Sequence, residues 1–138
     1  MTTHTDLELD HGTAGPEPAW TMSARLAELS VVRDRVACGE RRAVEVQHAK
    51  GKLTARERIA LLLDEGSFHE VEPLRRHRAQ GFGLEGKRPY SDGVLVGWGT
   101  VFGRKVFTYA HDFRIFGGAL GEAHAQKIHK IMDMAIAA

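Results

Sequence analysis

The sequence is poor in the features that mark membrane, secreted or nucleic-acid-binding proteins. It has 138 residues and a single cysteine, Cys38, which excludes an internal disulfide and fits a reducing cytoplasm. It has no apolar run near the roughly 20 residues that a membrane-spanning helix needs. Lysine and arginine number 19 against 18 acidic residues, and the resulting net charge of +1 does not favour a nucleic-acid partner. We expect one globular cytoplasmic domain, with neither a membrane nor a nucleic acid as its partner.

Motifs for metal binding and for nucleophilic catalysis are also missing. The sequence has eight histidines but neither a Cys-x-x-Cys nor a His-Glu-x-x-His motif. His124 and His129 lie about 140° apart around a helix, so they do not share a face. His111 and Asp112 are neighbours in an expected strand and point to opposite faces, which favours a structural role. Because a Gly-x-Ser-x-Gly elbow is absent too, we name no metal ligand and no catalytic side chain.

The two ends of the sequence differ in character. Residues 1–22 are acidic, rich in threonine and broken by glycines and prolines, which predicts a disordered leader. Residues 23–138 are expected to form one unit. From Met134 to Ala138 an apolar helical run continues without a C-cap glycine or a terminal lysine. We therefore expect the chain to stop inside an element.

Helical periodicity follows the leader. The stretch from Ser23 to about Ala37 predicts an amphipathic helix, with Ser23 as its N-cap and Gly39 as its end. A second short helix is expected from Glu40 to Lys50. The apolar face of the first helix, expected to pack against a core or a partner subunit, consists of Leu26, Leu29, Val32 and Val36.

A third helix begins with a capping box. The Thr54 hydroxyl can accept from the Glu57 amide, while the Glu57 carboxylate reaches back to Thr54. Gly66 is expected to stop this helix, and its buried face is expected to consist of Ile59, Leu62 and Leu63. A basic cluster surrounds the helix start and consists of Lys50, Lys52, Arg56 and Arg58. This basic cluster is either a solvated surface or a patch that pairs with the phosphates of an anionic ligand.

Three extended segments are expected. Ser67 to Val71 is short, and Val94–Val101 and Lys105–Phe113 form a hairpin joined by Phe102-Gly103-Arg104. The apolar runs of the hairpin are nearly continuous rather than alternating. Such runs indicate strands covered on both faces, as in the layers of an α/β fold.

A glycine turn, Phe116-Gly117-Gly118, joins the last strand to a fourth helix. Such a junction aims backbone N–H groups and the positive end of a helix at a ligand, which suits a phosphate or a developing oxyanion. The same glycines, with Gly121, also fit an incomplete dinucleotide fingerprint, or a tight turn that needs glycine for steric reasons alone. Residues at helical spacing after the turn are Ala119, Leu120, Ala123, Lys127, Ile128, Ile131, Met134 and Ala135.

These motifs together resemble one enzyme family. The segments that carry the resemblance are Gln47–Ile59, Leu61–Phe68, Asp92–Val94, His111–Glu122 and Gln126–Ile128. Over residues 23–138 the sequence is similar to the N-terminal part of the carboxyltransferase (β) subunit of biotin-dependent acyl-CoA carboxylases, of the propionyl-CoA or acetyl-CoA type.

The resemblance implies a fold, a reaction and partners. The fold is an α/β crotonase-like carboxyltransferase domain, incomplete here and preceded by N-terminal helices. The reaction moves a carboxyl group from carboxybiotin to the α-carbon of acetyl-CoA or propionyl-CoA, giving malonyl-CoA or methylmalonyl-CoA. Biotin is carried by a separate α subunit or carrier, and the β subunits form a hexamer. Backbone amides rather than a side-chain nucleophile stabilise the thioester enolate.

The resemblance also assigns a substrate site. Only Phe116, Gly117 and Gly118 are carried over, as an element of the acyl-CoA pocket. Lys52 and Arg56 are candidates for the CoA phosphates because of their place in the basic cluster, and not because of the resemblance. On this reading the isolated chain is inactive and at best partly folded. Two other functions stay open at this point. One is a truncated, non-catalytic module that docks onto full-length subunits, and the other is a nucleotide-binding α/β domain.

Overall fold

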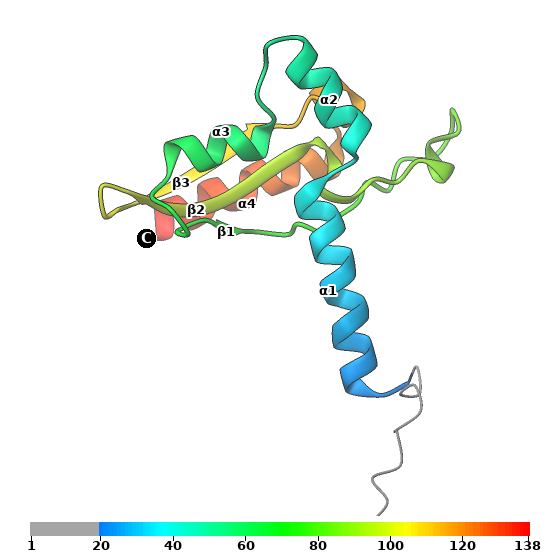
Figure 1. The fold of residues 1–138 in the computed structure, drawn as a ribbon, viewed down its shortest axis with the longest axis horizontal. Coiled ribbons are helices and arrows are strands. Elements are labelled where there is room, and N and C mark those ends of the chain that lie inside the picture. The colour runs from blue at the N-terminus through cyan, green and yellow to red at the C-terminus, as the bar shows by residue number, and fades with distance from the viewer. Residues whose placement is uncertain (1–19) are drawn as a thin grey trace, which may run out of the picture.

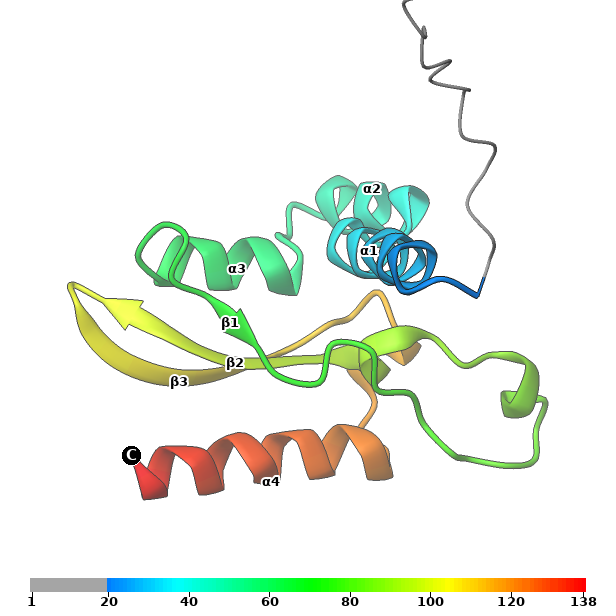
Figure 2. The same cartoon turned by 90° about the horizontal axis from the view of Figure 1, so that it is seen from below.

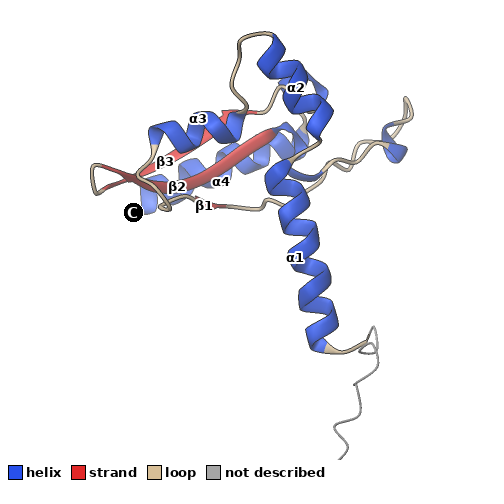
Figure 3. Cartoon of the chain, in the orientation of Figure 1, coloured by secondary structure: helices blue, strands red, loops and turns tan. Residues whose placement is uncertain are grey.

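The computed structural model describes residues 20–138, which are arranged as helices, a sheet and a further helix in three layers (Figures 1 and 2). Residues 1–19 of the expected disordered leader lie outside the described residues. No helix in the described part of the chain is long and apolar enough to cross a membrane. The elements expected from the sequence are present, and the differences lie mainly at their ends (Figure 3).

The first two helices lie where periodicity placed them. Helix α1 spans Met22–Cys38 and α2 spans Arg41–Ala49. The N-cap of α1 is Thr21, whose Oγ1 accepts from the Ala24 amide at 3.2 Å, so the expected cap at Ser23 was wrong. No residue of α1 is buried, and the helix projects from the body of the molecule (Figure 1). Its apolar face therefore does not pack against a core within residues 20–138.

Helix α3, Ala55–Leu62, has the predicted capping box. The Glu57 amide donates to Thr54 Oγ1 at 3.3 Å, and the Thr54 amide donates to Glu57 Oε2 at 2.7 Å. The helix ends before Leu63 rather than at Gly66. Asp64 explains the early end, because its carboxylate accepts from the amides of the hairpin turn between the two long strands. Leu62 is therefore exposed, contrary to expectation.

The sheet contains β1 His69–Glu70, β2 Val94–Val101 and β3 Arg104–His111, paired antiparallel in the order β1-β2-β3. The long hairpin runs in register from the pair Val94 and His111 to the pair Val101 and Arg104. Its turn is Phe102–Gly103, with φ of 50° and 76°, so both turn residues are left-handed. β3 stops two residues before the expected Phe113.

Both faces of the hairpin are covered, as the continuous apolar runs predicted. Helix α3 packs on one face and α4, Glu122–Ala137, packs on the other (Figure 2). The α3 side buries Ala55, Ile59, Leu63, Leu95 and Ala110. The α4 side buries Val94, Val96 and Ile131. This sandwich fixes the end of β3 relative to the start of α4, where the glycine turn lies.

Helix α4 begins later than its periodicity indicated. Gly121 is its N-cap, so Ala119 and Leu120 lie before the helix instead of on its apolar face, and Leu120 is exposed. The segment between β3 and α4 is a tight 3₁₀ turn over Phe116–Gly118. An apolar residue at helical spacing was a poor guide here because this turn interrupts the helical path.

Candidate functional site

Residues 116–118, called the glycine corner below, connect the end of β3 to α4 (Figure 1). Their φ angles are all positive, at 47° for Phe116, 61° for Gly117 and 74° for Gly118. The turn is closed by the Gly118 amide, which donates to the Ile115 carbonyl at 2.8 Å. A left-handed phenylalanine is uncommon, so the surrounding structure must hold this conformation.

The two glycines of the corner have different surroundings. A Cβ on Gly117 would meet nothing within 4 Å, and the residue is exposed. A Cβ on Gly118 would lie 3.2 Å from the Phe113 ring and 3.5 Å from the Cβ of His111. Glycine at position 118 is therefore needed for close packing, whereas at position 117 it leaves backbone that a ligand can approach.

The N-terminus of α4 already holds an anion from the chain itself. The His124 amide, in the first turn, donates to Asp92 Oδ2 at 3.0 Å, and Asp92 is only 5% exposed. A carboxylate at this position satisfies a helix amide and complements the helix dipole. One amide of this helix end is therefore taken by the chain itself, and the expectation that the junction binds a phosphate or an oxyanion stays a prediction.

A pair of histidines lies next to the corner. His124 is fully buried, and its Nε2 lies 3.1 Å from Nδ1 of the partly exposed His111. Burial is the main cause that lowers the pKa of His124. His129 is exposed on another face of α4, as predicted. Within residues 20–138 no group of three or more potential ligands is placed to hold a metal ion.

Lys127 is a buried charge that sequence reasoning missed. Its Nζ donates to the carbonyls of Val94 at 2.5 Å and Ser91 at 2.9 Å, and the side chain is fully buried. Burial lowers its pKa to about 8. The only sign of this burial in the sequence was that Lys127 stands among the apolar residues that recur at helical spacing in α4. It supports the turn before β2, where Ser91 and Asp92 have positive φ.

The structure separates the basic cluster into a paired residue and exposed ones. Arg56 donates to Glu70 at 2.6 Å and is partly buried, so a ligand phosphate would compete with a carboxylate for it. Lys52, Lys50 and Arg58 are exposed. No hydrogen bond or ion pair in the described part of the chain joins Lys52 or Arg56 to the glycine corner. The sequence-predicted site residues thus form two separate groups.

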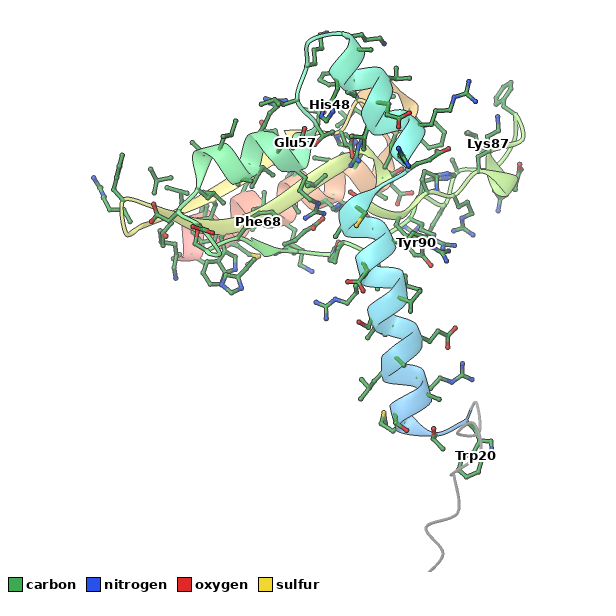
Figure 4. All side chains as sticks on the ribbon, in the orientation of Figure 1. Trp20, His48, Glu57, Phe68, Lys87 and Tyr90 are labelled. Carbon is green, nitrogen blue, oxygen red and sulfur yellow. The ribbon has the colours of Figure 1, made fainter. Side chains whose placement is uncertain are left out.

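The Glu57 carboxylate, which caps the start of α3, also makes a hydrogen bond to a side chain of α2. His48 Nε2 lies 2.9 Å from Glu57 Oε1, and the two side chains point toward each other (Figure 4). This hydrogen bond, followed by those from Thr54, lowers the pKa of Glu57 to about 2. Glu57 is therefore charged throughout the physiological range, and this negative charge sits within the basic cluster.

A cavity of about 240 Å³ lies beside Arg56, and its lining includes Tyr90 and Arg114. Arg114 donates through Nε and Nη2 to the buried carboxylate of Asp112, at 2.9 and 2.7 Å. A Cβ on Gly39, between α1 and α2, would collide with the Arg114 guanidinium. This cavity therefore joins the α1–α2 junction to the segment just before the glycine corner, and its lining contains both basic and acidic side chains.

The comparisons with known proteins come from sequence and from structure. A model of the carboxyl transferase domain matches residues 46–138. The chain is 60% identical over 98 residues to the propionyl-CoA carboxylase beta chain of Cereibacter sphaeroides, covering 71% of this chain and 19% of that protein. It is 53% identical over 117 residues to the propionyl-CoA carboxylase beta chain of Saccharopolyspora erythraea, covering 84% and 21%. The chain thus spans about a fifth of the length of these curated relatives.

A solved structure shares the fold. The transcarboxylase 12S structure with methylmalonyl-coenzyme A and methylmalonic acid bound matches with a TM-score of 0.81 and 41% identity, covering 86% of this chain and 23% of that chain. The likeness confirms the fold class expected from the sequence, an α/β arrangement of the crotonase-like type.

Proposed function

The chain belongs to the carboxyl transferase domain family, and on that premise we propose that it forms part of the carboxyltransferase component of a biotin-dependent acyl-CoA carboxylase. The proposed reaction transfers a carboxyl group to the α-carbon of acetyl-CoA or propionyl-CoA and gives malonyl-CoA or methylmalonyl-CoA. The observation that carries the proposal is the family match over residues 46–138, which includes the glycine corner and its approachable backbone at Gly117.

The substrate site is proposed at the glycine corner. Of Phe116, Gly117 and Gly118, the first two are exposed, and Gly117 offers open backbone at the end of the sandwich, which suits a thioester that must lie close to the main chain. Lys52 is proposed to pair with a CoA phosphate, since it is exposed and has no carboxylate partner in the described structure. Arg56 is proposed as a weaker phosphate contact because Glu70 already holds it.

The partners follow from the same premise. Carboxybiotin, carried by a separate α subunit or carrier protein, supplies the carboxyl group when it is bound. We assign no residue of 20–138 to biotin. A hexamer of β subunits is proposed, supported by the hexamer assembly of the similar transcarboxylase 12S. A cytoplasmic location is proposed and can be checked by cell fractionation.

A segment exchange tests the proposed function. In the propionyl-CoA carboxylase beta chain of Saccharopolyspora erythraea, the 117 aligned residues are replaced by the corresponding residues of this chain. We expect the chimaeric β chain, mixed with its biotin-carrying subunit, to carboxylate propionyl-CoA, because the exchanged segment supplies the same layers and the same corner. Product formation is measured as acid-stable radioactivity from labelled bicarbonate.

The control is the parent β chain, together with a chimaera in which Gly117 is replaced by tryptophan to block the approach to the corner. A chimaera that folds and assembles but yields no methylmalonyl-CoA would contradict the proposed function. Lys52→Ala in the chimaera should raise the KM for propionyl-CoA but not for propionyl-pantetheine, which lacks the phosphates. Equal effects on both substrates would remove Lys52 from the site.

A docking module is the second candidate, and one observation favours it. Helix α1 exposes Met22, Leu26 and Leu29 without burying any residue, as a helix that packs on another subunit would. A pull-down of the unmodified parent β chain by this chain, without any gain in activity, would select this candidate. A nucleotide-binding role is disfavoured because Asp92 occupies the N-terminus of α4.

A further inference from the structure

The hydrogen bonds of the histidine pair fix the position of each ring proton. Nδ1 of His124 lies 3.0 Å from the carbonyl oxygen of Asp92, and Nε2 lies 3.1 Å from Nδ1 of His111. A carbonyl oxygen only accepts, so Nδ1 of His124 carries the proton. In the neutral ring Nε2 is then an acceptor, and Nδ1 of His111 must be its donor. Both neutral rings are therefore Nδ1–H tautomers.

This arrangement leaves one nitrogen of His111 available. Nδ1 is committed to His124, so Nε2 of the neutral ring has a lone pair, and no described residue bonds it. The His111 ring is partly exposed. It meets the Tyr109 ring edge-on, with 6.0 Å between the two ring centroids. The Cβ of His111 would lie 3.5 Å from a Cβ added at Gly118, so the His111 side chain packs beside the glycine corner. The available acceptor thus belongs to a side chain beside the glycine corner.

We infer that His111 is a further ligand-contacting residue of the glycine corner, and that His124 is a positioning residue that acts through it. His124 holds the His111 ring so that Nε2 presents an acceptor to an N–H or O–H donor of the ligand. This inference rests on the proposed function. In an acyl-CoA, the groups that match a neutral acceptor include the amide N–H groups and the hydroxyl of the pantetheine arm.

The charges around the pair favour the amide arm over a phosphate. An unprotonated phosphate oxygen has no hydrogen to offer a lone pair, and the Asp92 carboxylate already occupies the neighbouring helix end. The cations of the basic cluster have no described bond to the corner, so they do not neutralise a phosphate there. The corner is therefore assigned to the pantetheine arm, and any phosphate contacts belong to the basic cluster.

Spectroscopy on the chain tests the arrangement directly. The histidine rings are labelled with ¹⁵N, and long-range ¹H–¹⁵N correlations report which ring nitrogen carries the proton. We expect both His111 and His124 to be Nδ1–H tautomers at neutral pH. Adding propionyl-pantetheine should shift the Nε2 resonance of His111 and leave the exposed His129 unchanged. An Nε2–H tautomer at His124, or an unmoved His111 signal, would overturn the inference.

Substitutions in the chimaeric β chain separate ligand contact from support. His111→Asn keeps a donor near the position of Nδ1 but has no counterpart of Nε2, so a purely structural role would survive it. We expect this variant to raise the KM for propionyl-CoA roughly 2- to 10-fold, as for loss of one neutral hydrogen bond, with kcat and the melting temperature unchanged. His124→Asn keeps the donor to Asp92 and should raise KM similarly, because His111 is no longer held.

The matched control is His129→Asn. His129 is an exposed histidine on α4, the helix that also carries His124, and its replacement should leave the KM for propionyl-CoA unaltered. If His111→Asn behaves like the unmodified chimaera, His111 only supports the corner and the inference fails. If the chimaera itself has no activity, the proposed function fails instead, and the spectroscopic measurement on the chain decides the inference alone.

Discussion

Lys127 holds a strained turn by means of a single buried charge. Its ammonium group donates to the carbonyls of Ser91 and Val94, in the turn that contains the left-handed residues Ser91 and Asp92. Each carbonyl also accepts from a second donor, the Val94 amide for Ser91 and the Ser91 hydroxyl for Val94, so the lysine adds a charged donor to a turn that already closes on itself. Because the turn precedes β2 and Asp92 accepts from the His124 amide in the first turn of α4, the lysine contributes to the position of the whole corner.

We predict that the stabilising effect of Lys127 grows with pH. Burial lowers its pKa from 10.5 to about 8, so between these values the unfolded chain binds more protons than the folded one. Stability gained from this residue therefore rises with pH across that window. The unfolding free energy of the parent chain, minus that of Lys127→Met, should rise by about 2 kcal/mol between pH 7 and pH 10. Urea denaturation at both pH values measures it.

Lys130→Met provides the comparison for this prediction. Lys130 is on the same helix, half-exposed and paired with Glu72 at 2.5 Å, so its removal should produce no comparable rise. Equal pH dependence in the two variants would show that Lys127 is not desolvated as the structure indicates.

Single residues differ in how far the sequence could predict them. Thr54 and Glu57 were predicted correctly because a capping box is made within one turn of chain. Lys127 and Asp92 were not, because their partners are 33 to 36 and 32 residues away. The two glycines of the corner looked alike in sequence. Only the positions of Phe113 and His111 distinguish the packed Gly118 from the open Gly117.

At the scale of the element, helix α3 depends on a cap that titrates. The pKa of Glu57 is lowered from 4.5 to about 2, first by the hydrogen bond with His48 and then by those from Thr54. A depressed carboxyl pKa contributes stability that is fully present above pH 4.5 and is lost as the pH falls towards 2. We predict that Glu57→Gln flattens the acid limb of the stability curve, as followed by denaturant midpoints between pH 6 and pH 2.5.

Glu65→Gln is the matched change, since Glu65 is an exposed carboxylate just beyond the end of the same helix. It should leave the acid limb as steep as in the parent chain. Thr54→Ala should destabilise the chain by about 1 kcal/mol at neutral pH, the usual value of an N-cap. If Glu57→Gln and Glu65→Gln have the same acid limb, the cap does not carry the pH dependence.

Elements were predicted better than their ends. The two strands of the hairpin and all four helices follow from periodicity and turn residues, which are local signals. The end of α3 and the start of α4 were misplaced because tertiary contacts set them. Asp64 accepts hydrogen bonds from the hairpin turn, and Asp92 takes the amide of His124 at the first turn of α4. Neither contact has a signature within a window of neighbouring residues.

At the scale of the whole molecule, the outer layers expose large apolar side chains. Leu61 on α3 is 76% exposed and Ile136 on α4 is 84% exposed, while α1 buries nothing. Both sides of the three-layer sandwich therefore have apolar surface available for contact. The continuous apolar runs of the hairpin predicted the layers, but the position of α1 away from the body could not be read from its amphipathic pattern, because periodicity identifies an apolar face and not what covers it.

We predict that the 138-residue chain alone has no carboxyltransferase activity and associates through these apolar faces. The chain spans about a fifth of its curated relatives, we assign none of residues 20–138 to biotin, and its exposed apolar side chains favour burial against other surfaces. Sedimentation should show concentration-dependent association, and a dye that binds apolar surface should fluoresce more with the chain than with the chimaeric β chain. Turnover of propionyl-CoA by the purified chain, or a monomer that does not bind the dye, would contradict this prediction. Leu61→Lys with Ile136→Lys should reduce both association and dye binding, because charge at the two faces opposes their burial.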